Sequence, residues 1–224
     1  MKKNQKIVAL VPLRRGSKSI PNKNIKNIAG KPLCYWSLNS AYKSGIFDKI
    51  IVSTDSEVIA KIVENFGFNI KIIMRPERYA TDKASTESVM IHISKKVDFD
   101  ILVTIQATSP LVNPEDFISA KKLFLEKKYD SLLSGVRIKR FIWSSKGEPL
   151  NYDPMKRPRR QEFDGSIVED GSFYFTKRHI LNKYKCRLGG KIGIYEMKDQ
   201  VFTEIDEAND WLFFEKILRK KYYK

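Results

Sequence analysis

Histidine and cysteine are both scarce in this sequence, which contains two of each among 224 residues. Cys34 and Cys186 lie far apart and lack the spacing of a metal-binding pair, so we interpret them as structural thiols. His92 and His179 are equally isolated, and we interpret both as structural or exposed residues. The sequence therefore predicts neither a cysteine-based metal site nor a reactive cysteine, and it assigns no general base.

Long apolar runs are also absent. No segment approaches the roughly 18 apolar residues that would cross a membrane, so no membrane partner is expected. The apolar run that follows residues 1–6 is too short for the core of a signal peptide. The 42% of hydrophobic and 12% of aromatic residues nevertheless argue against a disordered chain. We expect a soluble, cytoplasmic protein with a substantial core, folded as one domain over residues 1–224.

Acidic residues are outnumbered, because 42 Lys and Arg stand against 26 Asp and Glu and give a formal net charge of +16. One interpretation is a nucleic-acid-binding protein, and the other is a lysine-rich surface around a site for anionic small molecules. No zinc-finger, RRM or helix-turn-helix pattern accompanies the lysines. We therefore expect no nucleic-acid partner, and we keep a basic nucleic-acid-binding protein as the distant alternative.

Apolar, β-rich runs alternate with helical patterns along most of the chain. We expect strands at Lys6–Leu13, Lys49–Thr54, Ile70–Met74, Asp100–Gln106 and Ser131–Val136. We expect helices at Leu33–Lys43, Ser56–Phe66, Ser85–Lys96 and Pro114–Lys127. Strand character resumes at 167–175 and 191–197, and a terminal helix is expected at 207–219. The alternation predicts an α/β fold with a Rossmann-like, mostly parallel sheet and helices on both faces.

Polar motifs follow the expected strands at their carboxyl ends. The loop at residues 14–24 combines two arginines, a glycine, two serines and two lysines. Such a loop can wrap a polyphosphate, because glycine lets the backbone approach closely and the cations supply charge. Further polar segments begin at Ser53, Arg75 and Gln106. Since ligands of parallel sheets bind beyond the carboxyl ends of the strands, we expect these segments to converge on one site.

Residues 138–166 break this pattern. They contain three prolines, show no amphipathic period and include a basic run from Lys156 to Gln161. A long irregular stretch inside a compact domain is commonly functional or part of an interface. We expect the same of this insertion.

The motifs together resemble those of the acylneuraminate cytidylyltransferases, also called CMP-sialic acid synthetases. The matching blocks occur in consistent order over nearly the whole chain: Arg14, Gly16-Ser17-Lys18, Ile20-Pro21 and Lys23-Asn24; Ile51 to Asp55; Arg75-Pro76 and Ala80-Thr81-Asp82; Gln106 to Leu111; Lys156 to Gln161; Gly171 to Phe175; and Glu204 to Trp211. The basic run and the Gly171 block are most similar to the animal-type branch. Animal homologues carry a C-terminal phosphatase-like domain, which we expect to be absent because the chain ends at Lys224.

Four positions depart from the family pattern. Leu13 stands where a small residue is usual, and Glu207 occupies a position often filled by Thr or Val. Glu204 replaces a common aspartate but keeps a carboxylate, so metal binding is expected to survive. Asp170 replaces a usual asparagine before Gly171, which puts the identity of the substrate in question.

The resemblance implies a nucleotide-diphospho-sugar transferase type of fold and a reaction between CTP and a nonulosonic acid of the sialic class. The sugar C2 hydroxyl would attack the α-phosphorus of CTP, giving the CMP-sugar and pyrophosphate. Mg²⁺, or Mn²⁺ in its place, would bridge phosphate oxygens. The same chemistry on Kdn, legionaminic or pseudaminic acid remains open, because buried hydrogen bonds decide such a choice. Kdo is less expected, because its enzymes carry a different first loop.

The resemblance also implies which residues act on the nucleotide. Arg14, Lys18 and Lys23 would bind the triphosphate and, with Asp206, would be the catalytic residues. Asp206 and Glu204 would hold the metal, since side chains two apart on an extended segment share one side. A helix cap is the alternative role for Asp206, and Asp210 is the expected bystander. The nucleotide-binding residues would be Leu13, Arg14, Gly16, Ser17, Asn24, Arg75 and Thr86.

The expected sugar-binding residues are Gln106, Thr108, Ser109, Arg160, Gln161 and Tyr174. Alternatives remain for several of these positions: Tyr174 as a core aromatic ring, Arg75 as an ion-pair partner of Glu77, and Thr86 as an ordinary helix residue. In the family, the irregular segment reaches across a homodimer. We therefore expect a homodimer, or a tetramer built as a dimer of dimers, with residues 138–166 contributing to the interface.

Overall fold

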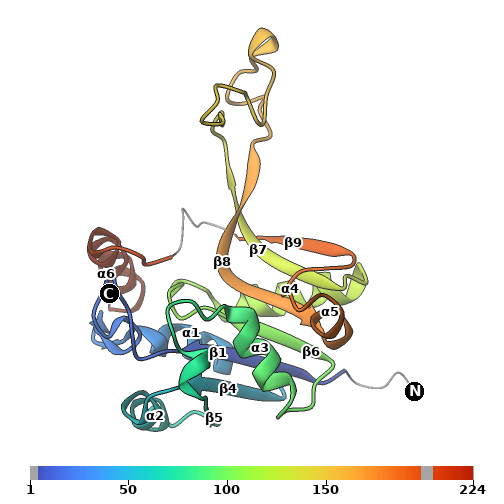
Figure 1. The fold of residues 1–224 in the computed structure, drawn as a ribbon. Helices are drawn as coiled ribbons and strands as arrows, with labels where there is room; N and C mark the ends of the chain where they lie inside the picture. The colour runs from blue at the N-terminus through green and yellow to red at the C-terminus, as the bar shows by residue number, and fades with distance from the viewer. Residues whose placement is uncertain (1–4, 198–203, 224) are drawn as a thin grey trace.

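A seven-stranded sheet forms the centre of the computed structural model, which describes residues 5–197 and 204–223 (Figure 1). The strand order in these residues is β5-β4-β1-β6-β8-β7-β9. The strands are β1 (Ile7–Leu13), β4 (Lys49–Thr54), β5 (Ile70–Met74), β6 (Ile101–Ile105), β7 (Ser131–Ile138), β8 (Ser166–Lys177) and β9 (Ile192–Glu196). β8 pairs antiparallel with β6 and β7, whereas β1, β4, β5 and β6 pair in parallel and β9 pairs in parallel with β7. The predicted mostly parallel sheet is confirmed.

Helices cover both faces of the sheet. They are α1 (Leu33–Ser44), α2 (Glu57–Glu64), α3 (Thr86–Ser94), α4 (Pro114–Glu126), α5 (Arg178–Tyr184) and α6 (Ala208–Tyr222). Along β1, Ala9 and Val11 pack in a cluster with side chains of α1, α2 and α4, whereas Val8 and Leu10 pack with side chains of α3 and α5. Both faces of this strand are therefore buried, which explains its continuous apolar sequence.

The predicted elements agree with the structure within a few residues at each end. Elements that the sequence analysis did not predict are short: the helix α5 and the two-residue strands β2 (Asn27–Ile28) and β3 (Lys31–Pro32). The α5 helix follows β8 directly, and its N-cap residue Lys177 makes no side-chain capping hydrogen bond. Without a cap or a full amphipathic period, seven residues carry too weak a signal to be recognised.

A large bulge interrupts β8. Leu133 of β7 is opposite Tyr174 and Gly135 is opposite Glu169, so the four residues 170–173 face Ser134 alone. The buried carboxylate of Asp170 accepts hydrogen bonds from the hydroxyl of Ser134 at 2.5 Å and of Ser172 at 2.6 Å. Because the backbone amide of Gln106 donates to Ser172 O, the bulge lies directly beside the carboxyl end of β6.

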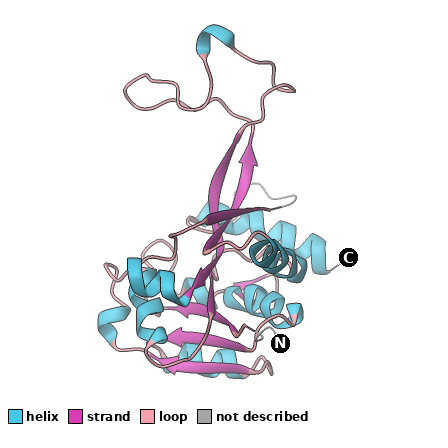
Figure 2. Ribbon diagram, turned by 90° about the vertical axis from the view of Figure 1, so that its right-hand side faces the viewer, coloured by secondary structure: helices cyan, strands magenta, loops and turns pink. Residues whose placement is uncertain are grey.

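Residues 139–165, hereafter the arm, project from the end of the β7–β8 ribbon (Figures 1 and 2). The regular structure described in the arm is limited to η3 (Pro154–Lys156) and a bridge between Trp143 and Pro149. Phe141 stacks on Tyr152 at 4.1 Å, and the Arg157 guanidinium lies 4.4 Å from the Phe141 ring. The expected irregular segment is thus organised around a small aromatic cluster of its own.

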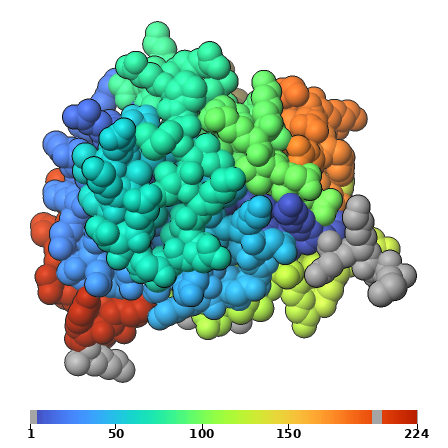
Figure 3. Space-filling view, turned by 90° about the horizontal axis from the view of Figure 1, so that it is seen from below, coloured from blue at the N-terminus to red at the C-terminus, as the bar shows by residue number. Residues whose placement is uncertain are grey.

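The C-terminal helix α6 packs against the first third of the chain (Figure 3). Trp211, Phe214 and Leu218 join a buried cluster with Leu33 and Trp36. This packing holds the segment before α6 next to the loop at residues 14–24. None of the described helices is long and apolar enough to span a bilayer.

Two adjacent phenylalanines of α6 allow a matched test of this packing. Phe214 is 2% exposed, whereas Phe213 is 53% exposed. We expect Phe214→Ala to lower the free energy of unfolding by about 3–5 kcal/mol, because it removes a buried ring and leaves a cavity. Phe213→Ala should change it by less than about 1 kcal/mol. Urea unfolding of both variants measures the difference, and equal losses would contradict the assigned packing.

Candidate active site

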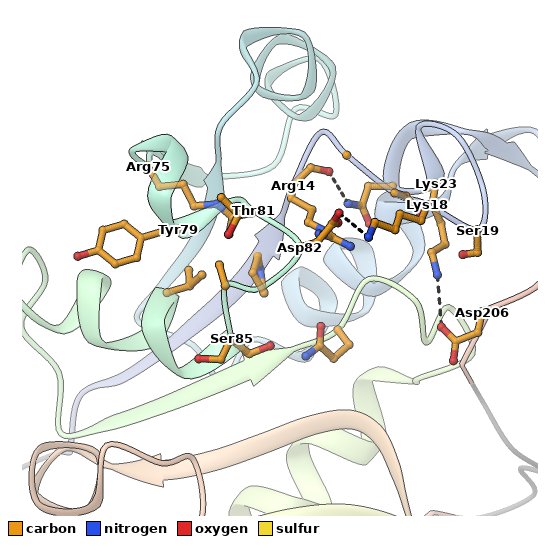
Figure 4. A pocket seen from close by; sticks show the side chains of 18 residues that line it. Arg14, Lys18, Ser19, Lys23, Arg75, Tyr79, Thr81, Asp82, Ser85 and Asp206 are labelled. Carbon is orange, nitrogen blue, oxygen red and sulfur yellow. Dashed lines mark hydrogen bonds and ion pairs between the residues drawn. The ribbon is translucent and has the colours of Figure 1, made fainter.

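The largest concentration of predicted site residues surrounds a cavity of about 450 Å³ beyond the carboxyl ends of the parallel strands (Figure 4). Segments that follow β1, β5 and β6 meet there, as does the segment that precedes α6. The predicted residues that line the cavity are Arg14, Gly16, Ser17, Lys18, Lys23, Asn24, Arg75, Thr86, Gln106 and Asp206. The expected convergence is confirmed for the segments that follow β1, β5 and β6. The segment that begins at Ser53 does not line the cavity, although its Asp55 contacts Arg15 and Arg75.

The loop after β1 is held at both of its ends. The amide of Arg15 donates to Asp55 Oδ1 at 2.9 Å, and Asn24 Nδ2 donates to the carbonyl of Arg14 at 3.0 Å. Ile20, 3% exposed, anchors the middle of the loop in the cluster beneath α6. These contacts fix the backbone from which the loop cations reach the cavity.

Arg14 and Lys18 share one carboxylate partner, Asp82. Arg14 Nη1 lies 2.7 Å from Asp82 Oδ1, and Lys18 Nζ lies 3.0 Å from Asp82 Oδ2. Hydrogen bonds from Lys18 and Arg14 hold the pKa of the Asp82 carboxyl below its usual range. No role for Asp82 could be predicted from its motif alone, because its partner Arg14 is 68 residues away in sequence.

Arg75 is buried at the wall of the cavity. Its backbone amide donates to Thr54 O, and only 3% of its side chain is exposed. The Nη2 atom lies 3.9 Å from Asp55 Oδ1, whereas Nε and Nη1 have no hydrogen-bond partner among the described residues. Burial lowers the pKa of Arg75 below its usual value. Buried polar groups are nearly always hydrogen-bonded, so these donors indicate a place where a ligand supplies the acceptors.

Lys23 and Asp206 join the loop after β1 to the segment before α6. Lys23 Nζ donates to Ile205 O at 2.7 Å and lies 3.3 Å from Asp206 Oδ1. The amides of Asp206 and Glu207 both donate to Asp210 Oδ2. Asp210 therefore caps α6 from inside its first turn, as the bystander interpretation predicted, and leaves the Asp206 side chain at the cavity.

Glu204 lies over the bulge of β8, where a side chain at Gly171 would collide with its carboxylate. The residue as a whole is exposed, whereas its carboxylate lies against the backbone of Gly171. Burial, followed by the charges of Asp206 and Asp170, raises the pKa of Glu204 to about 7. Crowded carboxylates of this kind fit a hard divalent cation. Within residues 5–197 and 204–223, no group of three or more acidic, histidine or cysteine side chains is arranged to hold a metal, so further ligands would come from substrate and water.

Gln106 lines the cavity, but the remaining predicted sugar-binding residues do not. Thr108 accepts a hydrogen bond from Ile205 N through its carbonyl, and Ser109 is buried. Arg160 and Gln161 are exposed on the arm. The predicted nucleotide-binding residue Leu13 has a fully buried side chain in the core, so this side chain serves packing.

Tyr174 is a buried strand residue with polar contacts. Its hydroxyl donates to Glu169, and the Arg187 guanidinium lies 4.7 Å from its ring. Arg187 in turn pairs with Glu87 in the first turn of α3 at 2.5 Å. Arg187 and Glu87 were not among the predicted site residues, because nothing local marks two residues that are 100 positions apart as partners.

A family model described as cytidylyltransferase matches residues 8–219. The N-acylneuraminate cytidylyltransferase A of Danio rerio is 38% identical over 231 residues, covering 99% of this chain and 53% of that protein. The N-acylneuraminate cytidylyltransferase of Oncorhynchus mykiss is 36% identical over 225 residues, covering 97% of this chain and 51% of that protein. The chain thus spans about half the length of these relatives.

Solved structures share the fold. A CMP:2-keto-3-deoxy-manno-octonic acid synthetase complexed with CTP has a TM-score of 0.75 and 19% identity, covering 96% of this chain and 99% of that one. The 4-diphosphocytidyl-2C-methyl-D-erythritol synthase of Anaerococcus prevotii has a TM-score of 0.67 and 14% identity, with 96% of each chain covered. At these identities the likeness concerns the fold alone.

The unpaired donors of Arg75 lead to a stability prediction. We expect Arg75→Met to raise the free energy of unfolding of the ligand-free protein by about 1–3 kcal/mol, because it removes buried donors without partners. The control is Arg178→Met, since Arg178 donates to Ser94 O, Val97 O and Phe99 O and its loss should destabilise the protein. Chemical denaturation gives both values. A loss of stability in Arg75→Met as large as in the control would mean that Arg75 is a structural residue.

Proposed function

The chain belongs to the cytidylyltransferase family, and on this premise we propose that it activates a nonulosonic acid of the sialic class with CTP, giving the CMP-sugar and pyrophosphate. Two curated relatives that match nearly the whole chain are named N-acylneuraminate cytidylyltransferase. We propose in addition that the protein is cytoplasmic, as expected from its sequence.

The observation that carries the proposal is the buried, incompletely paired guanidinium of Arg75 in a cavity that also contains Arg14, Lys18 and Lys23. A nucleoside triphosphate fits this combination, because it joins three phosphate groups to a base and a ribose with neutral acceptors. The loop cations would take the phosphates, and Arg75 would donate to the base or ribose. Asn24 supports the nucleotide indirectly, since it holds the carbonyl of Arg14.

In the proposed reaction, the C2 hydroxyl oxygen of the sugar forms a bond to the α-phosphorus as the bond to the pyrophosphate oxygen breaks. The hydroxyl proton passes to water, and the negative charge moves to pyrophosphate. Lys23 is suited to stabilise this leaving group, because its side chain is only 11% exposed and its ammonium donates to Ile205 O. Such a displacement depends on positioning and charge stabilisation, so it requires no protein nucleophile.

Asp206 and Glu204 would hold Mg²⁺, or Mn²⁺ in its place. The divalent ion would neutralise phosphate charge and bring the two carboxylates into one ligand set. Lys23 contacts Asp206 directly, so its ammonium and the bound ion would act on the same phosphates.

The sugar would lie against Gln106, whose amide offers a donor and an acceptor to hydroxyl groups. Tyr174 and the Arg187–Glu87 pair would form the wall behind it. We propose further that the protein is a homodimer and that Arg160 and Gln161 of one arm complete the site of the partner. Support comes from the basic arm, which projects away from the rest of the fold in Figures 1 and 2 and contributes no residue to the lining of the cavity in its own chain. Polar contacts in this part of the site would decide which acid is bound: sialic, Kdn, legionaminic or pseudaminic acid.

Pyrophosphate release from CTP and Mg²⁺ with a panel of nonulosonic acids tests the reaction. We expect release with at least one acid and a loss of at least about 100-fold in Asp206→Ala, because a metal ligand is removed. Asp210→Ala is the matched control, since it removes the α6 cap and should cost about 1 kcal/mol of stability but little turnover. No release with any acid would reject the proposal, and salt-dependent binding of oligonucleotides instead would favour the nucleic-acid alternative.

Complementation between two inactive variants tests the arm. We expect Asp206→Ala and Arg160→Ala to be impaired separately but to recover about a quarter of wild-type activity when co-expressed, because each mixed dimer would contain one intact site. Two Asp206→Ala chains with distinct tags provide the control and should recover nothing. Absence of recovery, with mixed dimers present, would mean that Arg160 does not serve the partner's site.

A further inference from the structure

An internal carboxylate occupies the position where the loop cations would meet phosphate. The two oxygens of Asp82 divide between two partners, with Arg14 at 2.7 Å and Lys18 at 3.0 Å (Figure 4). Arginine and lysine side chains donate charge-assisted hydrogen bonds to carboxylate oxygens and to phosphate oxygens alike. Asp82 therefore satisfies the donors that the triphosphate would need.

The segments that carry Arg14 and Asp82 differ in how many contacts fix them. The backbone around Arg14 is fixed by Asp55 and Asn24. Asp82 lies in the connection between η2 (Glu77–Tyr79) and α3, where one backbone hydrogen bond, from Ala84 N to Thr81 O, closes a turn. If the contact breaks, the connection that carries Asp82 is the side that can move.

We propose that Asp82 sets the affinity of the phosphate site by competition: its carboxylate holds Arg14 and Lys18 in the free protein, is displaced by the phosphate chain of the nucleotide, and returns as pyrophosphate leaves. The identity of the nucleotide rests on the proposed function. The competition itself requires only a polyphosphate that binds to the loop after β1.

The exposure of these ion pairs makes the exchange feasible. The side chains of Asp82 and Arg14 are 45% and 37% exposed, and that of Lys18 is 79% exposed. Exposed ion pairs contribute little to stability, so a ligand with several negative charges displaces the single carboxylate readily. A monoanion gains much less over Asp82, and the carboxylate therefore favours polyphosphates over smaller anions. After the reaction, the Asp82 carboxylate can return to Arg14 and Lys18 and take the place of pyrophosphate.

Binding of inorganic pyrophosphate, measured by calorimetry in the absence of nucleotide, tests the competition. We expect Asp82→Asn to lower the Kd for pyrophosphate by roughly three- to tenfold, because the competing charge is lost. Asp82→Glu, which retains a carboxylate, should remain close to the wild-type value. An unchanged or higher Kd in Asp82→Asn would overturn the proposal.

Asp98→Asn is the control for net charge. Asp98 is also an exposed carboxylate between two cations, with Lys6 at 3.6 Å and Arg178 at 3.3 Å, but it precedes β6 at the opposite edge of the sheet. The Asp98→Asn variant should leave the Kd for pyrophosphate unchanged. An equal gain in affinity in both variants would mean that overall charge, and not the contact with Arg14 and Lys18, sets the affinity.

Hydrogen exchange of wild-type protein separates displacement from simple charge repulsion. If pyrophosphate removes Asp82 from its partners, the amides of residues 80–84 should exchange faster in the complex than in the free protein. Slower or unchanged exchange would contradict the displacement. Both measurements use pyrophosphate alone, so they remain decisive even if no nonulosonic acid is a substrate and the proposed reaction is rejected.

Discussion

The buried guanidinium of Arg75 is the constraint on which this site depends. A charged side chain that is 3% exposed, and of which Nε and Nη1 lack partners among the described residues, is costly for a folded protein. It is tolerated where a ligand completes its hydrogen bonds. The sheet explains its position: Arg75 follows β5, and the parallel strands β1, β4 and β6 bring their own polar ends to the same edge.

Charge balance around the cavity follows from segments that are distant in sequence. At one end of the cavity, the negative charge of Asp82 offsets the positive charges of Arg14 and Lys18. At the other end, the positive charge of Lys23 offsets the negative charge of Asp206. Helix α6 is necessary for the second pair, because the burial of Phe214 and Trp211 fixes the segment that carries Asp206. The free protein therefore keeps both groups of charged side chains partly neutralised, and a bound nucleotide with a divalent cation would replace these internal partners.

Much of this arrangement was predictable from the sequence, for a physical reason. The carboxyl ends of parallel strands share one edge, so motifs that follow successive strands must converge, and Arg14, Arg75 and Gln106 do line one cavity. The family resemblance was likewise confirmed by the match over residues 8–219. Contacts across long sequence separations were not predictable: the Asp82 pairs, the bulge at 170–173 and the Glu87–Arg187 pair depend on packing between elements that no local pattern reveals.

A crystal structure of the protein with CTP and Mg²⁺ tests the central claim most directly. The account predicts that acceptor atoms of the cytosine or ribose lie within about 3 Å of Nε or Nη1 of Arg75, with the phosphates on the loop after β1. A nucleotide bound in this cavity while both Arg75 nitrogens remain unpaired, or a nucleotide bound elsewhere on the molecule, would contradict it.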